Sequence, residues 1–319
     1  MRIGRVAAVT DTGRRRLRNQ DAYVSESPLF AVADGMGGAQ AGELASQIAA
    51  AAIEERTGTD GRGEEAVAEL VRRANERVYR RATEDPAAAG MGTTATVALV
   101  DVNAGTIAIG HVGDSRAYRL RDGVLEQLTA DHSLVAELVR SGRLTEEEAV
   151  DHPHRSVITR ALGTDPDVDV DALTVEIAPG DLYLICSDGL THMLPDADVL
   201  ATATAGDGDP DRMAALLVEA ANRAGGEDNI TVIVFEIVDG DEPVDAGDAL
   251  TEVDEVTAES QPLQQPAQQA EPAEPAERPS GRLRVRRHGP GSGGRLLALA
   301  AIATALVVAG LVVYWGVWQ

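Results

Sequence analysis

Residues 29–38 read LFAVADGMGG, an apolar run that ends in an aspartate followed by a glycine. The same pattern returns at residues 182–190, LYLICSDGL, where Asp188 closes the run. Such runs, rich in apolar and β-branched residues, are typical of buried strands. A glycine after the aspartate leaves the backbone open to a ligand. Asp34 and Asp188 are therefore predicted to project carboxylates from the ends of two rigid strands.

Two further aspartates precede predicted strands. Asp21 stands before AYV, and Asp228 stands before Asn229 and the run ITVIVFEIV. Several carboxylates share one site only when cations neutralise them, and oxygen ligands favour Mg²⁺ or Mn²⁺ over Zn²⁺. Two such ions would activate a water molecule and hold a phosphoryl group. Arg16, five residues before Asp21, is suited to bind that phosphate.

The remaining pattern predicts an α+β domain over residues 1–238. Strands are expected near residues 3–9, 23–33, 93–101, 106–112, 116–121, 173–178, 181–187 and 230–238. Helices are expected near residues 41–56, 64–84, 133–141, 145–150, 196–203 and 210–224. Asn103-Ala104-Gly105 and Asp122-Gly123 are typical hairpin turns. Short turns between strands indicate antiparallel sheets, and the long helices are expected to pack on a β-sandwich.

Composition excludes several classes of protein. The chain has 319 residues, a net charge of −24 and only 3% aromatic residues, which argues against a nucleic-acid partner. All 28 basic residues are arginine, so the lysine of a Walker-type phosphate loop or of a kinase is missing. The single cysteine, Cys186, excludes a disulfide within the chain and fits a reducing compartment.

The C-terminal part divides into three segments of different physical character. Residues 239–277 hold twelve acidic residues and no basic one, and they are predicted to form a disordered Pro/Gln/Glu-rich linker. Residues 278–295 hold six arginines and no acidic residue. Residues 296–318 are 23 uncharged residues, and a helix of roughly 34 Å would cross the bilayer. The arginines before this helix predict a single-pass membrane protein with its catalytic domain in the cytoplasm.

These motifs together resemble the metal-dependent protein serine/threonine phosphatases of type 2C, and the resemblance spans residues 3–238. The motifs occur in the family's order: RLRNQD at 16–21, VADGMGG at 32–38, GMGTTATVALV at 90–100, GHVGDSRAY at 110–118, LTADHS at 128–133, ITRALG at 158–163, CSDGL at 186–190 and EDNITVIV at 227–234. The resemblance implies a four-layer α-β-β-α sandwich of two antiparallel sheets flanked by helix pairs. It also implies a flap near residues 132–158.

The resemblance assigns roles to individual residues. Arg16 would bind the phosphate, Asp34 would bridge two Mn²⁺ or Mg²⁺ ions, and Asp131 would serve a third ion seen in some members. Asp21, Asp34, Asp188, Asp228 and the Gly35 carbonyl would be metal ligands, with Gln20, Asp114 and Asn229 around them. For Asp114 a purely structural role is equally open.

Two departures from the family pattern affect the chemistry. Many eukaryotic members carry histidine, the proposed proton donor, where this chain has Met36, which has no proton to donate. Many relatives carry glutamate where this chain has Gln20. Gln20 adds no negative charge, so weaker binding of the second ion is expected.

The sequence therefore predicts a membrane-tethered phosphatase in which a metal-activated water hydrolyses phosphoserine and phosphothreonine in proteins. Its expected partners are phosphorylated proteins, including a membrane serine/threonine kinase and its substrates, and membrane lipid through residues 296–318. One alternative is an inactive pseudophosphatase that binds phosphoproteins at the membrane. Another is a two-carboxylate glycosidase, although such an enzyme needs one carboxyl group of raised pKa rather than a carboxylate cluster.

Overall fold

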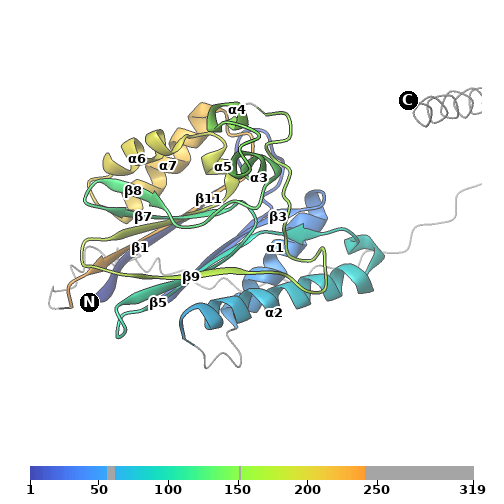
Figure 1. The fold of residues 1–319 in the computed structure, drawn as a ribbon, viewed down its shortest axis with the longest axis horizontal. Helices are drawn as coiled ribbons and strands as arrows, with labels where there is room; N and C mark the ends of the chain where they lie inside the picture. Colours follow the sequence, from blue (N-terminus) through green and yellow to red (C-terminus); the bar gives the residue numbers. More distant parts are fainter. Residues whose placement is uncertain (56–61, 151, 241–319) are drawn as a thin grey trace, which may run out of the picture. The chain divides into compact units, whose positions relative to one another are not determined.

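Two antiparallel sheets, stacked face to face, form the centre of the molecule in this computed structural model, which describes residues 1–55, 62–150 and 152–240 (Figure 1). One sheet has the strand order β1 (Arg2–Asp11), β11 (Ile230–Val238), β10 (Leu182–Cys186), β7 (Arg116–Arg121) and β8 (Val124–Gln127). The other has the order β2 (Asp21–Glu26), β3 (Leu29–Met36), β5 (Ala95–Asp101), β6 (Thr106–Val112) and β9 (Asp171–Glu176), with β4 (Gly92–Thr93) paired to β3.

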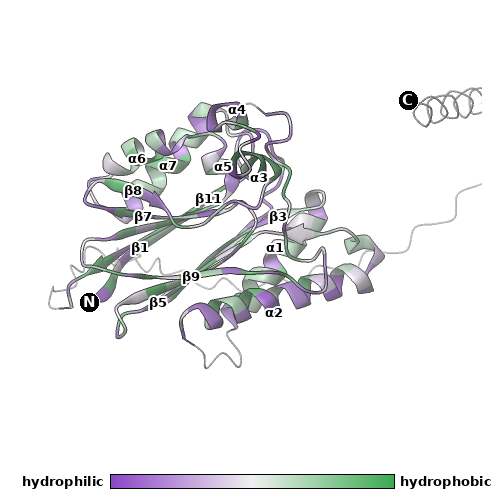
Figure 2. Ribbon diagram, in the orientation of Figure 1, coloured by the Kyte–Doolittle hydropathy of each residue, from purple (hydrophilic) through white to green (hydrophobic). Residues whose placement is uncertain are grey.

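Pairs of helices cover the outer faces of both sheets. Helices α1 (Ala39–Glu54) and α2 (Gly63–Glu84) pack on the β2–β9 sheet, and α6 (Asp196–Thr204) and α7 (Pro210–Ala224) pack on the β1–β8 sheet. Hydrophobic and hydrophilic residues alternate along these helices, so each buries one face (Figure 2). The predicted layers of helix, sheet, sheet and helix are confirmed for the described residues.

Strand β3 explains why the run LFAVAD is continuously apolar. Side chains alternate between the two faces of a strand. Leu29 and Ala31 lie in the core beneath α1 and α2, whereas Phe30 and Val32 lie in the core between the sheets. Both faces are therefore buried, and Asp34 continues the row of Phe30 and Val32 at the point where the strand leaves the core.

Aromatic rings join the two sheets inside this central core. The rings of Phe30 on β3 and Phe235 on β11 stack with centroids 4.1 Å apart. Tyr183 on β10, the cross-strand neighbour of Phe235, stacks with it at a centroid distance of 5.3 Å. Phe30 and Phe235 are the only phenylalanines of the chain, and all three rings are fully or almost fully buried.

The predicted turns are correct, and one predicted strand is wrong. Asp122 and Gly123, both with positive φ, connect β7 to β8, and residues 103–105 connect β5 to β6. The single strand expected over residues 23–33 is two strands, β2 and β3, paired through a tight turn at Ser27-Pro28. The sequence does mark this break with Ser25-Glu26-Ser27-Pro28, a polar stretch that ends in proline, and the prediction overlooked it.

Four short helical segments complete the described part of the chain: η1 (Pro86–Ala88), α3 (Leu134–Arg140), α4 (Glu146–Val150) and α5 (Asp188–Thr191). Helices α3 and α4 lie in the long connection between β8 and β9. The two ends of the segment that contains them are joined by hydrogen bonds from the Leu134 amide to the Val157 carbonyl and from the Thr159 amide to the His132 carbonyl. This segment coincides with the residues predicted to form a flap.

The predictions for the C-terminal segments fall outside the described residues. These are the linker from residue 241 onward, the arginine-rich segment 278–295 and the spanning helix 296–318. Within residues 1–55, 62–150 and 152–240, no helix combines the length and apolar character needed to cross a membrane.

Candidate metal centre

The register of β2 and β3 places Asp21 and Asp34 directly opposite each other. Residues paired in this way project to the same face of a sheet, and here that face points toward the other sheet. The Asp34 backbone is fixed because its amide donates to Thr94 Oγ1 at 2.9 Å and its carbonyl accepts from the Thr93 hydroxyl at 2.8 Å. Two carboxylates therefore leave one sheet side by side.

The facing sheet supplies the other two carboxylates. Asp188 begins α5 directly after β10, and Asp228 lies just before β11. Two hydroxyls of this sheet reach across to Asp21, because Ser187 Oγ and Thr231 Oγ1 both donate to Asp21 Oδ2, at 2.8 and 2.6 Å. The predicted set of four aspartates thus comes together where the ends of the two sheets meet.

Electrostatics show that this cluster is incomplete without cations. Asp21 Oδ1 and Asp188 Oδ1 are buried, and neither has a hydrogen-bond partner among the described residues. Burial raises the pKa of Asp21 to about 7, although the two hydroxyls oppose the rise. Burial, together with repulsion from Asp21 and Asp188, raises the pKa of Asp34 well above its usual range. Divalent cations would supply both the missing partners and the missing charge.

The fourth aspartate lies at the more open side of the cluster, where Arg16 meets it. Burial and the charge of Asp188 raise the pKa of Asp228. Arg16 Nη2 donates to Asp228 Oδ2 at 2.5 Å, and Arg16 Nη1 donates to Gln20 Oε1 at 3.4 Å. Its side chain remains 46% exposed, so the guanidinium is accessible to a ligand that enters the site.

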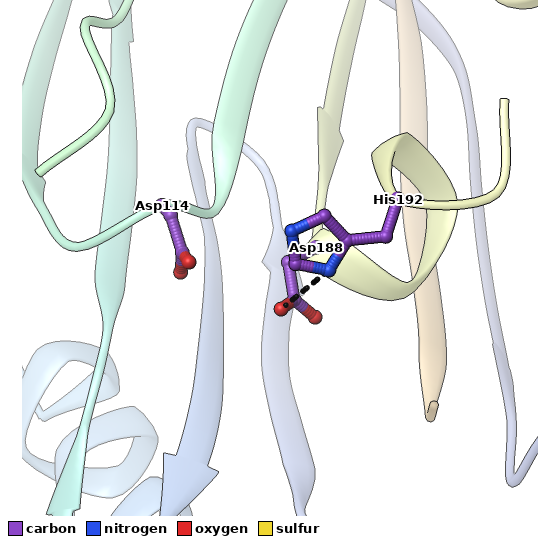
Figure 3. A group of neighbouring side chains, drawn as sticks. All are labelled: Asp114, Asp188 and His192. Atoms are coloured by element: carbon purple, nitrogen blue, oxygen red, sulfur yellow. Dashed lines mark ion pairs between the residues drawn. The ribbon is translucent and has the colours of Figure 1, made fainter. Parts of the chain in front are cut away.

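A second group of possible ligands lies beside the first. Asp114, in the loop after β6, and Asp188 and His192, from α5, offer ligand atoms that all lie within 4.8 Å of one another (Figure 3). His192 Nδ1 is 3.1 Å from Asp188 Oδ2. Neither carboxylate oxygen of Asp114 has a partner within the described residues, and burial raises the pKa of Asp114 to about 8. Burial alone would raise the pKa of Asp188, but the His192 hydrogen bond and charge hold it below its usual value.

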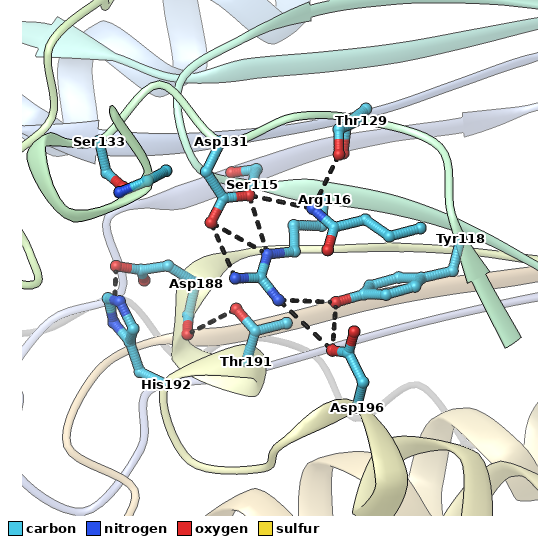
Figure 4. A network of polar contacts seen from close by, with 12 residues as sticks. Ser115, Arg116, Tyr118, Thr129, Asp131, Ser133, Asp188, Thr191, His192 and Asp196 are labelled. Carbon is cyan, nitrogen blue, oxygen red and sulfur yellow. Dashed lines mark hydrogen bonds and ion pairs between the residues drawn. The ribbon is translucent and has the colours of Figure 1, made fainter. Parts of the chain in front are cut away.

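Asp131, the predicted ligand of a third ion, is paired with Arg116, and its role as a ligand stays a prediction. Its carboxylate accepts two hydrogen bonds from Arg116 in a bidentate manner, from Nε to Oδ1 at 2.9 Å and from Nη2 to Oδ2 at 2.8 Å (Figure 4). The same guanidinium contacts Tyr118 and Asp196. The Asp131 carboxylate is thus paired with an arginine, as Asp228 is with Arg16, whereas neither carboxylate oxygen of Asp114 has a hydrogen-bond partner among the described residues.

The remaining predicted residues shape the site without adding charge. Asn229 accepts a hydrogen bond from the Gln20 amide at 2.8 Å and donates to the carbonyls of Thr12 and Arg18. It therefore holds the loop that carries Arg16. Gly35 is required at its position, since a Cβ atom there would lie 2.1 Å from the Gly42 carbonyl oxygen.

A cleft of about 540 Å³ opens over these residues. Its walls include Arg16, Asp34, Asp188 and Asp228, and also Met36. His192 was missed in the sequence. The available signal was its position four residues after Asp188, which puts both side chains on one face of a helical turn.

Residues 11–222 match the family described as protein phosphatase 2C. The serine/threonine protein phosphatase PstP of Mycobacterium tuberculosis is 37% identical over 318 residues, which cover 97% of this chain and 60% of that protein. This chain therefore spans about 60% of the length of that relative. The serine/threonine phosphatase stp of Listeria innocua is 37% identical over 238 residues, covering 71% of this chain and 93% of that protein.

Solved structures agree with these matches. A crystal structure of the PstP phosphatase of M. tuberculosis superposes with a TM-score of 0.69 at 38% identity, covering 74% of this chain and all of that one. The catalytic domain of PstP in complex with two manganese ions superposes with a TM-score of 0.67 at 38% identity, covering 74% of this chain and 99% of the other.

Proposed function

Because the chain belongs to the protein phosphatase 2C family of serine/threonine phosphatases, we propose that it hydrolyses phosphoserine and phosphothreonine in proteins with the help of two Mn²⁺ or Mg²⁺ ions. One observation carries the proposal. Asp21 and Asp34 from one sheet meet Asp188 and Asp228 from the other. The unpartnered oxygens of Asp21 and Asp188 and the raised pKa values of Asp21, Asp34 and Asp228 fit a site built for cations.

One group of residues would bind the metal ions, and another would bind the substrate. Asp21, Asp34, Asp188, Asp228 and the Gly35 carbonyl would hold the two ions. When bound, such ions supply Lewis acidity toward the phosphoryl group and an activated water as nucleophile. Arg16 lies at the edge of the same cleft, where its guanidinium can take two phosphate oxygens at once. Asn229 and Gln20 orient the loop that carries this arginine.

We propose that a third ion, where present, binds to Asp114, Asp188 and His192 rather than to Asp131. The supporting observation is the pair of unpartnered oxygens on Asp114, whose side chain is almost completely buried. Asp188 would then take part in both sites.

The location of the enzyme is part of the proposal and rests on the sequence. Residues 296–318 would anchor the chain in the cell membrane, and the arginines before them would keep the catalytic domain in the cytoplasm. Residues 239–295 would act as a flexible tether that raises the local concentration of phosphatase near membrane proteins. A membrane serine/threonine kinase and its substrates would be the natural targets of an enzyme held there.

The test uses para-nitrophenyl phosphate and a phosphothreonine peptide, with Mn²⁺, Mg²⁺ or a chelator. Asp34→Asn and Asp188→Asn remove ligands, and Asp167→Asn changes an exposed aspartate that does not line the cleft. We expect metal-dependent hydrolysis that both ligand variants lose and the control variant keeps. A folded protein that hydrolyses neither substrate under any metal condition would favour the pseudophosphatase alternative.

A further inference from the structure

Next to the phosphate-binding Arg16, the segment Arg14–Arg18 reads RRRLR and forms part of the rim of the cleft. Arg15, Leu17 and Arg18 all line the cleft together with Arg16, and all are exposed. Leu17 is 99% exposed, although a leucine side chain gains free energy by leaving water. A fully exposed leucine between arginines therefore does nothing for the stability of the fold.

The backbone of this segment is held firmly at both ends. The amides of Arg14 and Arg15 donate to the Gly226 carbonyl at 2.7 and 3.2 Å. Asn229 Nδ2 donates to the Arg18 carbonyl at 2.9 Å. Side chains that project from a fixed backbone can recognise a ligand at a small cost in conformational entropy.

The charges of the segment are compensated to different degrees, and Arg16 is paired with Asp228. Among the residues that the structure describes, the Arg15 guanidinium forms neither an ion pair nor a side-chain hydrogen bond. Arg18 contacts Glu43 at 3.4 Å, and its side chain is 54% exposed, so this pair is weak. In a chain of net charge −24, an unpaired guanidinium and a weakly paired one beside the catalytic cleft are a local exception.

We propose that Arg15, Leu17 and Arg18 form a specificity subsite for phosphoprotein segments that carry acidic side chains beside the phosphorylated residue. The inference rests on the proposed phosphatase function and adds the class of substrate. Guanidinium groups bind carboxylates in a bidentate manner, and Leu17 offers an apolar contact to the peptide between them. Because this contact is made equally before and during the reaction, it should act on KM rather than on kcat.

The test compares three phosphothreonine peptides of equal length whose flanking residues are acidic, neutral or basic. The full chain with Mn²⁺ should prefer the acidic peptide over the neutral one by about threefold to tenfold in kcat/KM, through KM. The preference should shrink in 0.5 M salt. In Arg15→Gln/Arg18→Gln the ratio between the two peptides should approach one. Taking the ratio within each variant cancels any general change in activity.

Arg80→Gln is the matched control, because Arg80 is an exposed arginine on α2, which packs on the outer face of a sheet and does not line the cleft. This variant should keep the full preference. Equal kcat/KM values for the three peptides, in a protein that hydrolyses para-nitrophenyl phosphate with metal, would overturn the subsite and leave the phosphatase function intact.

If the chain hydrolyses no substrate, fluorescence anisotropy with labelled versions of the same peptides measures their dissociation constants and so tests the subsite independently of catalysis. Tighter binding of the acidic peptide, lost in the double variant, would support the subsite even in an inactive protein. Equal dissociation constants would overturn it.

Discussion

Removal of the divalent ions should make this protein less stable as the pH rises from 4 to 8. The cause is the set of buried carboxyl groups whose pKa values the fold raises. Burial raises the pKa of Asp21 to about 7 and that of Asp114 to about 8, against 3.8 for an ordinary aspartate. At a pH between 3.8 and these raised pKa values, the metal-free folded chain keeps protons on these carboxyl groups that the unfolded chain has released. The stabilising contribution of these groups is therefore fully present below about pH 4 and is lost as the pH rises through their folded-state pKa values.

The size of the effect follows from the same values. For Asp21, a pKa about three units above 3.8 corresponds to roughly 4 kcal/mol, at about 1.4 kcal/mol per unit. A typical domain has only about 5–15 kcal/mol of total stability. His192 acts in the same direction, because the Asp188 hydrogen bond and charge outweigh burial and raise its pKa. The lowered pKa of Asp188 takes effect only at still lower pH, outside this range of pH.

Urea unfolding in the presence of a chelator, at pH 5 and at pH 8, measures this effect. Asp21→Asn keeps an oxygen to accept from Ser187 and Thr231 but carries no charge. We expect the chelated wild type to lose several kcal/mol between the two pH values and to regain it with Mn²⁺ at pH 8. The variant should be more stable than the wild type at pH 8 without metal, and it should gain little from Mn²⁺.

Asp167→Asn, at an exposed position, should behave like the wild type throughout. The reasoning would be refuted by a chelated wild type that is as stable at pH 8 as at pH 5. It would also be refuted if Asp21→Asn showed the same pH dependence as the wild type, since the charge of Asp21 would then have no effect on the free energy of unfolding.

Three further substitutions test other parts of the site. Arg116→Leu leaves the Asp131 carboxylate, only 14% exposed, without its cation and should cost about 3 kcal/mol in urea unfolding; a loss below 1 kcal/mol would contradict the structural role of the pair. Gly189→Ala places a Cβ atom 2.0 Å from the Asn229 carbonyl oxygen and should lower stability by about 2 kcal/mol, seen as a lower Tm; an unchanged Tm would speak against this packing. Gln20→Glu adds a negative charge beside the ions and should tighten Mn²⁺ binding about tenfold by calorimetric titration; equal affinity would show that the residue does not influence the metal.

The strand ends that carry the aspartates could be predicted because the signal is local. An apolar run followed by Asp-Gly is visible in a few residues, and Asp34 and Asp188 were found in this way. The layered arrangement followed from the order of strands and helices. The hairpin turn at Asp122-Gly123 was equally local, since both residues tolerate positive φ.

The features that were missed depend on contacts between distant segments. Asp114 and Asp131 are both acidic residues in loops that follow strands, and only the folded chain shows that Arg116 pairs with Asp131 and leaves Asp114 free. His192 follows a helix of four residues, which is too short for a periodic pattern. The break between β2 and β3 is the exception, because Ser27-Pro28 marks it locally and the prediction overlooked this signal.

The stacked rings of Phe30, Phe235 and Tyr183 carry an implication for how this chain can diverge. They fill the layer between the sheets, and each sheet contributes two of the four central aspartates at its end. The thickness of the layer therefore sets the gap across which those aspartates face one another. Descendants of this sequence can exchange outer helices and loops with little consequence, whereas a change in ring volume here would need a compensating change in the opposite sheet. We therefore expect these three ring positions to vary little among related sequences, although no substrate contacts them.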